Sequence, residues 1–315
     1  MRILVIGGCG YVGSVLCQRL LEEGHSVTVY DIMWFGNHLA EHDNLTVIEG
    51  DIRGTERVPM AGQDAVIHLA NVANDPCAEI DSGLSWEVNV LATMGLVELA
   101  IACGVKQFIY ASSGSVYGVK DEEQVTEELS LVPISDYNKT KMISERVLLS
   151  YGDQITIQIA RPATVCGLSP RMRLDLSVNM LTMQALANGR ITVFGGDQTR
   201  PNIHVQDLVG VYLHFLKKGA SVSGIYNAGF ENISILSIAE RAVEVAAAEI
   251  VVSESNDPRS YRLSSQKLLA TGYSPQYCVA DAMKEIAQAY RAGELTDTDG
   301  CYNIRTMKKA IAAAL

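Results

Sequence analysis

The chain has 315 residues, 48% of them hydrophobic and 19% charged, so it can bury one large core or two fused cores. Its formal net charge of −11 argues against nucleic acid or an anionic membrane as its main partner. The seven cysteines are scattered and contain no Cys-x-x-Cys pair, which fits a reducing compartment and predicts no metal site.

The first predicted element is a short buried strand at residues 2–6, and an amphipathic helix follows over residues 14–23. Since the chain opens on this strand, without a basic segment and an apolar run before it, we expect no signal peptide. We also find no apolar run of about eighteen residues, the length needed to span a bilayer. These features predict a cytoplasmic protein without a membrane partner.

The segment between that strand and its helix carries the pattern Gly-x-x-Gly-x-x-Gly. Gly7 allows a tight turn, Gly10 lets backbone approach a pyrophosphate, and Gly13 permits close packing of helix on strand. The helix N-terminus then offers free N–H groups to phosphate. A second strand, residues 26–30, ends at Asp31, whose carboxylate suits the ribose diol of NAD and would repel the extra phosphate of NADP. This order predicts an NAD site.

Short apolar strands and helices continue to alternate along the first half of the chain. Further strands are predicted at residues 45–48, 65–70, 106–112 and 155–160, and helices at residues 86–103 and 137–150. This alternation predicts an α/β fold with a doubly wound parallel sheet of the Rossmann type. Asp51 follows the third strand, where its carboxylate could accept a hydrogen bond from the adenine amine.

Tyr137 and Lys141 suggest a reaction type. Four residues on a helix make about one turn, so the phenol and the ammonium project from the same face. A nearby cation favours the phenolate and lowers the pKa of the phenol from about 10 toward working pH. Such a phenol can take a proton from a sugar or alcohol hydroxyl while hydride leaves the same carbon.

The organisation of the chain changes after Pro162. A loop-rich stretch at 166–173 leads to a predicted helix at 175–188, a strand at 191–194 and a loop at 195–200. Later elements are a strand and helix within 202–217, a strand at 224–228, and helices at 236–248 and 280–291. We expect a dinucleotide-binding domain of residues 1–165, to which 202–228 return, and a smaller α/β substrate lobe of residues 166–201 and 229–315. The tail from Gly293 has no predicted structure.

Together, the motifs of this chain resemble the extended short-chain dehydrogenases/reductases, the group that contains UDP-galactose 4-epimerase and the nucleotide-sugar dehydratases. They are Gly7-x-x-Gly10-x-x-Gly13, Asp31, Asp51-Ile52, His68-Leu69-Ala70, Asn89-Val90, the Ser112–Gly118 turn, Tyr137-x-x-x-Lys141, Arg161–Gly167 and Ile203-His204-Val205-x-Asp207. The segment Ser169–Asp175 further resembles a branch among bacterial surface-polysaccharide enzymes that includes GDP-heptose dehydrogenases.

The resemblance implies roles for particular residues. Tyr137 would be the general acid/base, Lys141 would bind the nicotinamide ribose and lower the pKa of the phenol, and Ser113 would hydrogen-bond the substrate hydroxyl unless it only caps a turn. His68 and His204 are expected to be structural. The NAD contacts would come from Gly7, Gly10, Tyr11, Val12, Gly13, Asp31, Asp51, Ile52, Leu69, Ala70 and Asn89, together with Tyr137 and Lys141.

The substrate implied is a nucleotide-diphosphate sugar. Arginines suit this ligand because a guanidinium pairs bidentately with phosphate oxygens. Arg200 and Arg259 match arginines that contact the diphosphate in relatives. Arg171 and Arg173 either grip phosphate or sugar, or close a lid, and Asn179 is assigned to the same site.

The reaction is narrowed by two positions after Ser113. Relatives that dehydrate the sugar carry Asp-Glu directly after the catalytic Thr, whereas this chain has Gly114 and Ser115. A Glu that family decarboxylases use near this turn is also absent. What remains is a 4-epimerase, which we favour, or a 4-dehydrogenase that releases the ketosugar. A non-catalytic dinucleotide-binding sensor is the alternative of another class. The resemblance also implies a homodimer formed through helices 86–103 and 137–150.

Overall fold

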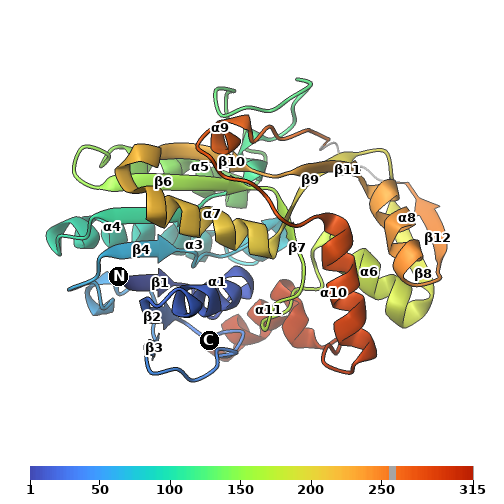
Figure 1. Ribbon diagram of the computed structural model, residues 1–315, viewed down its shortest axis with the longest axis horizontal. Helices are drawn as coiled ribbons and strands as arrows, with labels where there is room; N and C mark the ends of the chain where they lie inside the picture. The colour runs from blue at the N-terminus through green and yellow to red at the C-terminus, as the bar shows by residue number, and fades with distance from the viewer. Residues whose placement is uncertain (255–259, 315) are drawn as a thin grey trace.

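A seven-stranded parallel sheet forms the centre of the computed structural model, which describes residues 1–254 and 260–314 (Figure 1). Its strand order is β10-β6-β5-β4-β1-β2-β3. The strands are β1 (Arg2–Ile6), β2 (Ser26–Asp31), β3 (Leu45–Glu49), β4 (Ala65–His68), β5 (Gln107–Ala111), β6 (Thr156–Pro162) and β10 (Gly224–Ala228). The expected doubly wound α/β fold of the Rossmann type is therefore confirmed.

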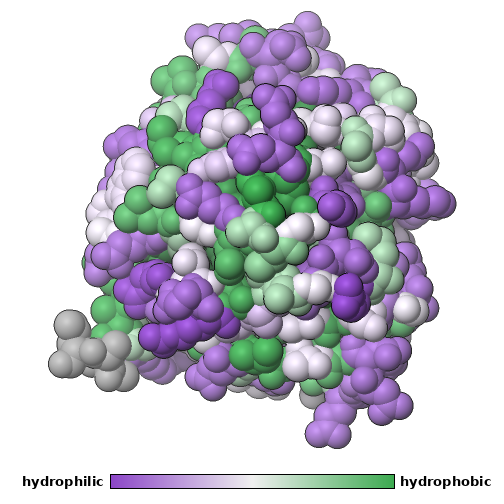
Figure 2. Space-filling view, turned by 90° about the vertical axis from the view of Figure 1, so that its left-hand side faces the viewer, coloured by the Kyte–Doolittle hydropathy of each residue, from purple (hydrophilic) through white to green (hydrophobic). Residues whose placement is uncertain are grey.

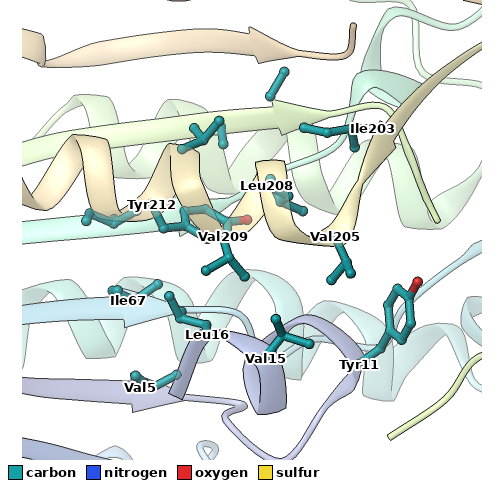
Figure 3. Packing of buried hydrophobic residues seen from close by; sticks show 14 of the residues in the cluster. Val5, Tyr11, Val15, Leu16, Ile67, Ile203, Val205, Leu208, Val209 and Tyr212 are labelled. Carbon is teal, nitrogen blue, oxygen red and sulfur yellow. The ribbon is translucent and has the colours of Figure 1, made fainter. Parts of the chain in front are cut away.

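Alternate residues of the central strands face two separate layers of helices. Ile3 and Val5 pack on one face with α1 (Tyr11–Glu22) and α7 (Val205–Lys218), which lie side by side (Figure 3). Leu4 and Ile6 pack on the opposite face with α4 (Ala92–Ala102) and α5 (Asp136–Leu149). Burial on both faces explains why these strands are continuous apolar runs rather than alternating ones.

The strand order reverses at β1. This strand pairs in parallel with β2 on one side and with β4 on the other. The connections leaving the two sides run in opposite directions, so a crevice opens outside the carboxyl ends of β1 and β4, where ligands bind in folds of this type.

A second, smaller lobe carries two short sheets. In one, β9 (Thr199–His204) pairs with β7 (Thr164–Cys166) and β11 (Glu231–Ser234); in the other, β8 (Arg190–Phe194) pairs with β12 (Glu249–Ser253). Residues 202–204, which the sequence analysis assigned to the returning segment, thus belong to the small sheet, and the return begins with α7. The helices of this lobe are α6 (Ser177–Asn188), α8 (Ile235–Val245), α9 (Gln266–Leu269) and α10 (Val279–Arg291).

The helix expected at residues 86–103 begins earlier, at residue 82. It consists of α3 (Ser82–Trp86), a π-helical turn (Glu87–Leu91) and α4. By length and composition it could cross a membrane, contrary to our expectation, but 44% of its most apolar window is buried and its helices pack on α5. It is the core helix of a Rossmann layer. The end of the molecule at the left of Figure 1 has a mixed surface, with apolar residues at its centre and hydrophilic residues around them (Figure 2).

The C-terminal tail forms α11 (Asn303–Ala314), which follows a short 3-10 turn at Asp299–Cys301. The predicted domain division includes this tail in the substrate lobe, with no secondary structure predicted for it. In the structure α11 returns to the main body and packs on α2 (Asp75–Ala78). There Met307 is buried in a cluster with Val72, Cys77 and Ala78. The tail therefore contributes to the wall beside the cofactor crevice.

Candidate active site

One cavity lies at the carboxyl ends of the central strands and collects most of the predicted site residues. It is lined by the glycine loop, the ends of β2 and β4, the start of α5, the segment after β7 and the start of α11. The predicted residues on its wall are Gly7, Gly10, Tyr11, Val12, Gly13, Asp31, Asp51, Ile52, Leu69, Ala70, Tyr137, Lys141, Arg171 and Arg173.

The glycine loop leaves no room for side chains at two of its positions. Gly7 has φ +86°, and a Cβ there would lie 2.4 Å from the main-chain nitrogen of Ala70. A Cβ on Gly13 would lie 2.4 Å from the carbonyl oxygen of Gly7. Gly10 precedes the first residue of α1 and offers no capping side chain. The bare helix N-terminus facing the cavity therefore fits the diphosphate of a dinucleotide.

Asp31 ends β2 with its carboxylate held in place. One oxygen accepts from the main-chain N–H of Cys9 at 2.9 Å, and the other from that of Met33 at 2.8 Å. Burial raises the pKa of Asp31, while these two hydrogen bonds and the charge of Arg171 oppose the rise. Each oxygen keeps acceptor capacity, so the group fits a ribose diol. These features meet the requirements for NAD.

Asp51 lies on the wall of the same cavity, but its carboxylate is already engaged. It accepts from the side chain of Arg53 at 2.6 and 2.9 Å, and from the main-chain N–H of Arg53 at 2.9 Å. Arg53 also pairs with Glu87 at 3.1 Å. A contact between Asp51 and adenine therefore remains a prediction, and it would share the carboxylate with Arg53.

Tyr137 stands in the first turn of α5, where Ser135 caps the helix by accepting from the main-chain N–H of Asn138. Burial raises the pKa of Tyr137 to about 12, which a hydrogen bond with Ser113 and the charge of Arg173 oppose. From the sequence, the neighbouring Lys141 predicts a lowered pKa for Tyr137. In the protein alone the direction is the reverse, because loss of hydration disfavours the phenolate more than these groups stabilise it.

Lys141 lies one turn further along α5, and its ammonium is buried. Its Nζ donates to the carbonyl oxygen of Ala111 at 2.7 Å, and lies 4.7 Å from the ring centroid of Tyr110 and 6.0 Å from that of Tyr137. Burial lowers the pKa of Lys141 to about 7, although the charge of Glu145 acts in the opposite direction. Lys141 thus lines the cavity as expected, but it loses its proton at a lower pH than an exposed lysine does.

Ser113 caps the 3-10 turn Gly114–Tyr117, which is the alternative role considered for it. Its hydroxyl accepts from the main-chain N–H of Ser115 at 3.2 Å and lies 2.7 Å from the Ser115 hydroxyl, which contacts Asn138. It also lowers the pKa of Tyr137. Ser113 is therefore connected to the phenol, although it is not among the residues lining the cavity.

Two predicted ligands lie behind the cavity wall. Asn89 accepts from the main-chain N–H of Val72 at 2.8 Å and donates to Thr140 at 3.0 Å. Asn179 donates to the hydroxyl of Tyr11 at 3.1 Å. Neither side chain lines the cavity in this structure, and each instead positions residues that do. Among the other substrate contacts, Arg200 lies in β9 of the small lobe, while Arg259 falls outside the described residues.

Several lining residues were not predicted. Trp34 and Phe35 follow Asp31, and their aromatic side chains in a loop were an available signal. Asn303 and Met307 come from α11, whose docking depends on contacts remote in sequence. Both residues line the cavity, although the tail that carries them had no predicted structure.

Comparisons with known proteins agree with this geometry. Residues 3–229 match the model of the NAD dependent epimerase/dehydratase family. A UDP-glucose 4-epimerase of Lactobacillus helveticus is 28% identical over 306 residues, which cover 88% of this chain and 93% of that protein.

Two solved structures are similar over almost their whole length. A UDP-glucose 4-epimerase of Thermus thermophilus in complex with NAD has a TM-score of 0.81 at 25% identity, covering 92% of this chain and 99% of the other. A UDP-glucuronic acid 4-epimerase of Bacillus cereus, in complex with UDP-glucuronic acid and NAD, has a TM-score of 0.81 at 26% identity, with 93% and 99% covered. The chain therefore belongs to the NAD-dependent epimerase/dehydratase family and is an enzyme whose cofactor is NAD.

Proposed function

We propose that this protein is a cytoplasmic nucleotide-sugar 4-epimerase. It would oxidise carbon 4 of the sugar to a ketone and return hydride to the opposite face. The observation that carries the proposal is that Tyr137 and Lys141 line the same cavity as the glycine loop, next to a turn without an added acid or base. UDP-sugar epimerases are among the proteins most similar to this chain.

The turn after Ser113 argues against elimination of water. Gly114 is buried, and a Cβ there would lie 3.2 Å from the carbonyl oxygen of Pro162. An acidic side chain at 114 would therefore crowd the main chain of β6. Ser115, the next residue, is hydrogen-bonded to Ser113 and Asn138. Neither position supplies the titratable groups that a dehydratase needs.

The 4-epimerase reaction requires a hydride acceptor and a proton acceptor at this site. NAD, when bound, supplies the hydride acceptor and, in the second half-reaction, the donor. The ionised Tyr137 phenolate would accept the proton of the carbon 4 hydroxyl, and the resulting phenol would later return it to the same oxygen. The Ser113 hydroxyl and the positive charge of Arg173 favour the ionised phenol, since both lower its pKa. Lys141 adds to this field while it is protonated.

The competing function is a 4-dehydrogenase that releases the ketosugar. Incubation of the protein and NAD with UDP- and GDP-sugars, followed by mass spectrometry and NMR, separates the two. We expect a pair of sugars that differ at carbon 4, with no net NADH. Accumulation of a ketosugar with an equal amount of NADH would establish the dehydrogenase instead.

Tyr137→Phe tests catalysis against a sensor function. The variant should lose at least about a hundredfold in turnover while it still binds NAD, because general acid–base catalysis contributes about 10²–10⁴-fold. A sensor would show no turnover on any nucleotide sugar with either protein.

Arg200→Ala tests whether Arg200 contacts the nucleotide sugar. This change should weaken nucleotide-sugar binding and leave NAD affinity unchanged, and equal loss of both in calorimetry would refute the assignment of Arg200.

We further propose that two copies associate through α4 and α5. Leu91 and Met94 are large apolar side chains exposed at the start of this helix layer, with 57% and 38% of their surface accessible. Such residues are typical of a helix face that is covered when two helices from each of two copies pack as a four-helix bundle. Sedimentation equilibrium should give a dimer that Leu91→Glu dissociates. A wild-type protein that sediments only as monomer would remove this proposal.

A further inference from the structure

Arg171 is a buried cation whose charge no described side chain neutralises. Only 3% of its surface is accessible, and its guanidinium lies 3.9 Å from the ring centroid of Phe35. Its Nη2 donates to the neutral amide oxygen of Asn303 at 2.6 Å, while its Nε has no hydrogen-bond partner among the described residues. Burying a guanidinium in this way is costly unless an anion completes the site.

The neighbouring Arg173 also has a buried nitrogen, Nη2, without a hydrogen-bond partner among the described residues, but its charge is paired. Arg173 donates from Nε to the carboxylate of Asp175 at 2.8 Å, so the acid nearest in sequence is already paired. Burial, followed by the like charge of Arg173, lowers the pKa of Arg171 to about 10. Arg171 itself has no ion-pair partner among the described residues, and it lies on the wall of the cavity.

The segment carrying Arg171 is fixed to the first turn of α1. The Tyr11 hydroxyl donates to the carbonyl oxygen of Gly167 at 2.7 Å, and Ser169 donates to the carbonyl oxygen of Tyr11 at 2.7 Å. The hydroxyls of Ser14 and Ser169 lie 3.0 Å apart. These contacts hold Gly167 and Ser169, four and two residues before Arg171, against the first turn of α1.

The two arginines are linked through Asn303 and Asp175, since Asn303 accepts from Arg171 and donates from its main-chain N–H to the carboxylate that pairs with Arg173, but their other neighbours differ. Arg171 stacks on Phe35, and its charge lowers the pKa of Asp31, which places it on the side where β2 ends. Arg173 instead lowers the pKa of Tyr137, at the reaction centre. The stacking on Phe35 places Arg171 beside the segment that follows β2, on the wall of the cavity that the glycine loop also lines.

We propose that Arg171 binds the diphosphate of NAD and, together with the N-terminus of α1, encloses it from two sides. The free Nε and the second nitrogen of the guanidinium fork provide the donors for a charge-assisted contact with phosphate oxygens. Asn303 positions the fork from α11. Arg171 was predicted from the sequence to contact the nucleotide sugar, and the present assignment makes it a cofactor contact instead. Arg173 remains assigned to the substrate. It depends on NAD as cofactor and not on the epimerase reaction.

Calorimetric titration of the full chain with NAD, ADP-ribose, adenosine, UDP and GDP tests the proposal. Arg171→Gln should weaken NAD and ADP-ribose by about 10- to 100-fold, the range for a lost charge-assisted hydrogen bond. It should leave adenosine, UDP and GDP within about twofold. Arg173→Gln is the matched control, with NAD affinity kept. Unchanged NAD affinity in Arg171→Gln, or an equal loss for adenosine, would overturn the proposal.

Thermal unfolding keeps the proposal testable if a variant folds poorly. Arg171→Met removes a buried unpaired cation, so the protein without NAD should melt at the same or a higher temperature than wild type, while the increase caused by NAD should shrink. A lower melting temperature with an undiminished NAD-induced increase would mark Arg171 as a purely structural residue. Asn303→Ala should give a smaller loss of NAD affinity and none for UDP or GDP, since it only positions the fork.

Discussion

Arg161 donates to both carboxylate oxygens of Glu145 on α5, with Nε to Oε1 at 2.9 Å and Nη2 to Oε2 at 2.6 Å. Both side chains are almost fully buried, with 2% and 0% of their surface accessible. Ser112 also donates to Glu145, and Arg161 donates to Tyr117 at 2.7 Å. This network joins β5, α5 and β6 under the floor of the cavity.

Glu145→Gln should therefore destabilise the protein by about 3–5 kcal/mol, because breaking a buried ion pair leaves an uncompensated charge. The free energy of unfolding in urea measures the effect. Glu98→Gln is a matched control, since Glu98 is exposed and only accepts from Tyr151, and it should change stability by about 0.5 kcal/mol or less. A loss below about 1 kcal/mol for Glu145→Gln would contradict this account.

The stability of the protein should depend on pH through Lys141. Its pKa is about 7 in the folded protein and 10.5 as the unperturbed reference, so between these values the unfolded chain binds a proton that the folded one has lost. Stability contributed by this residue therefore rises with pH across that window. Lys141→Met removes the dependence. The difference in unfolding free energy between wild type and variant should rise from pH 7 to pH 10, and parallel curves would disprove it.

Gly13→Ala should abolish NAD binding and destabilise the fold. Its Cβ would lie 2.4 Å from the Gly7 carbonyl oxygen and 2.7 Å from Gly8 Cα, so the glycine loop would have to move. Gly24→Ala is the control: no atom lies within 4 Å of its Cβ position, and its φ of +76° costs only about 1 kcal/mol of backbone strain. NAD titration should separate the two, and a Gly13→Ala protein with wild-type affinity would be inconsistent with this packing.

Met307→Ala tests the docking of α11. The side chain is 2% exposed and packs with Val72, Cys77 and Ala78, so its truncation should cost about 2–5 kcal/mol. Chemical denaturation provides the measurement. Lys308→Ala, on the exposed side of the same helix, should have little effect. Equal effects of the two changes would show that α11 is not anchored by Met307.

The sheet could be predicted because its strands are short apolar runs, and glycine turns and segments with helical periodicity separate one strand from the next. Gly7, Gly13 and Asp31 stand where sequence order alone places them, since their roles follow from local geometry. The direction of the Tyr137 pKa could not be obtained in this way. It depends on how many atoms exclude water from the phenol, and those atoms come from segments distant in the chain.

The packing partner of α11 could not be predicted from the sequence either. Ile304, Met307 and Ile311 are spaced as one face of a helix, so the helix itself could have been predicted. Its partner could not, because α2 and Val72 lie more than two hundred residues earlier. The role of Arg171 was ambiguous for a similar reason, as its neighbour Asn303 comes from this tail.

Because Asn303 and Met307 belong to the cavity wall, a growing polypeptide can complete its central sheet at Ala228 before that wall exists. At about 5–20 residues per second, the ribosome needs roughly 4–15 s to extend the chain from Ala228 to Asn303. During that interval the coenzyme crevice stands open on one side, and emergence of the final helix covers it.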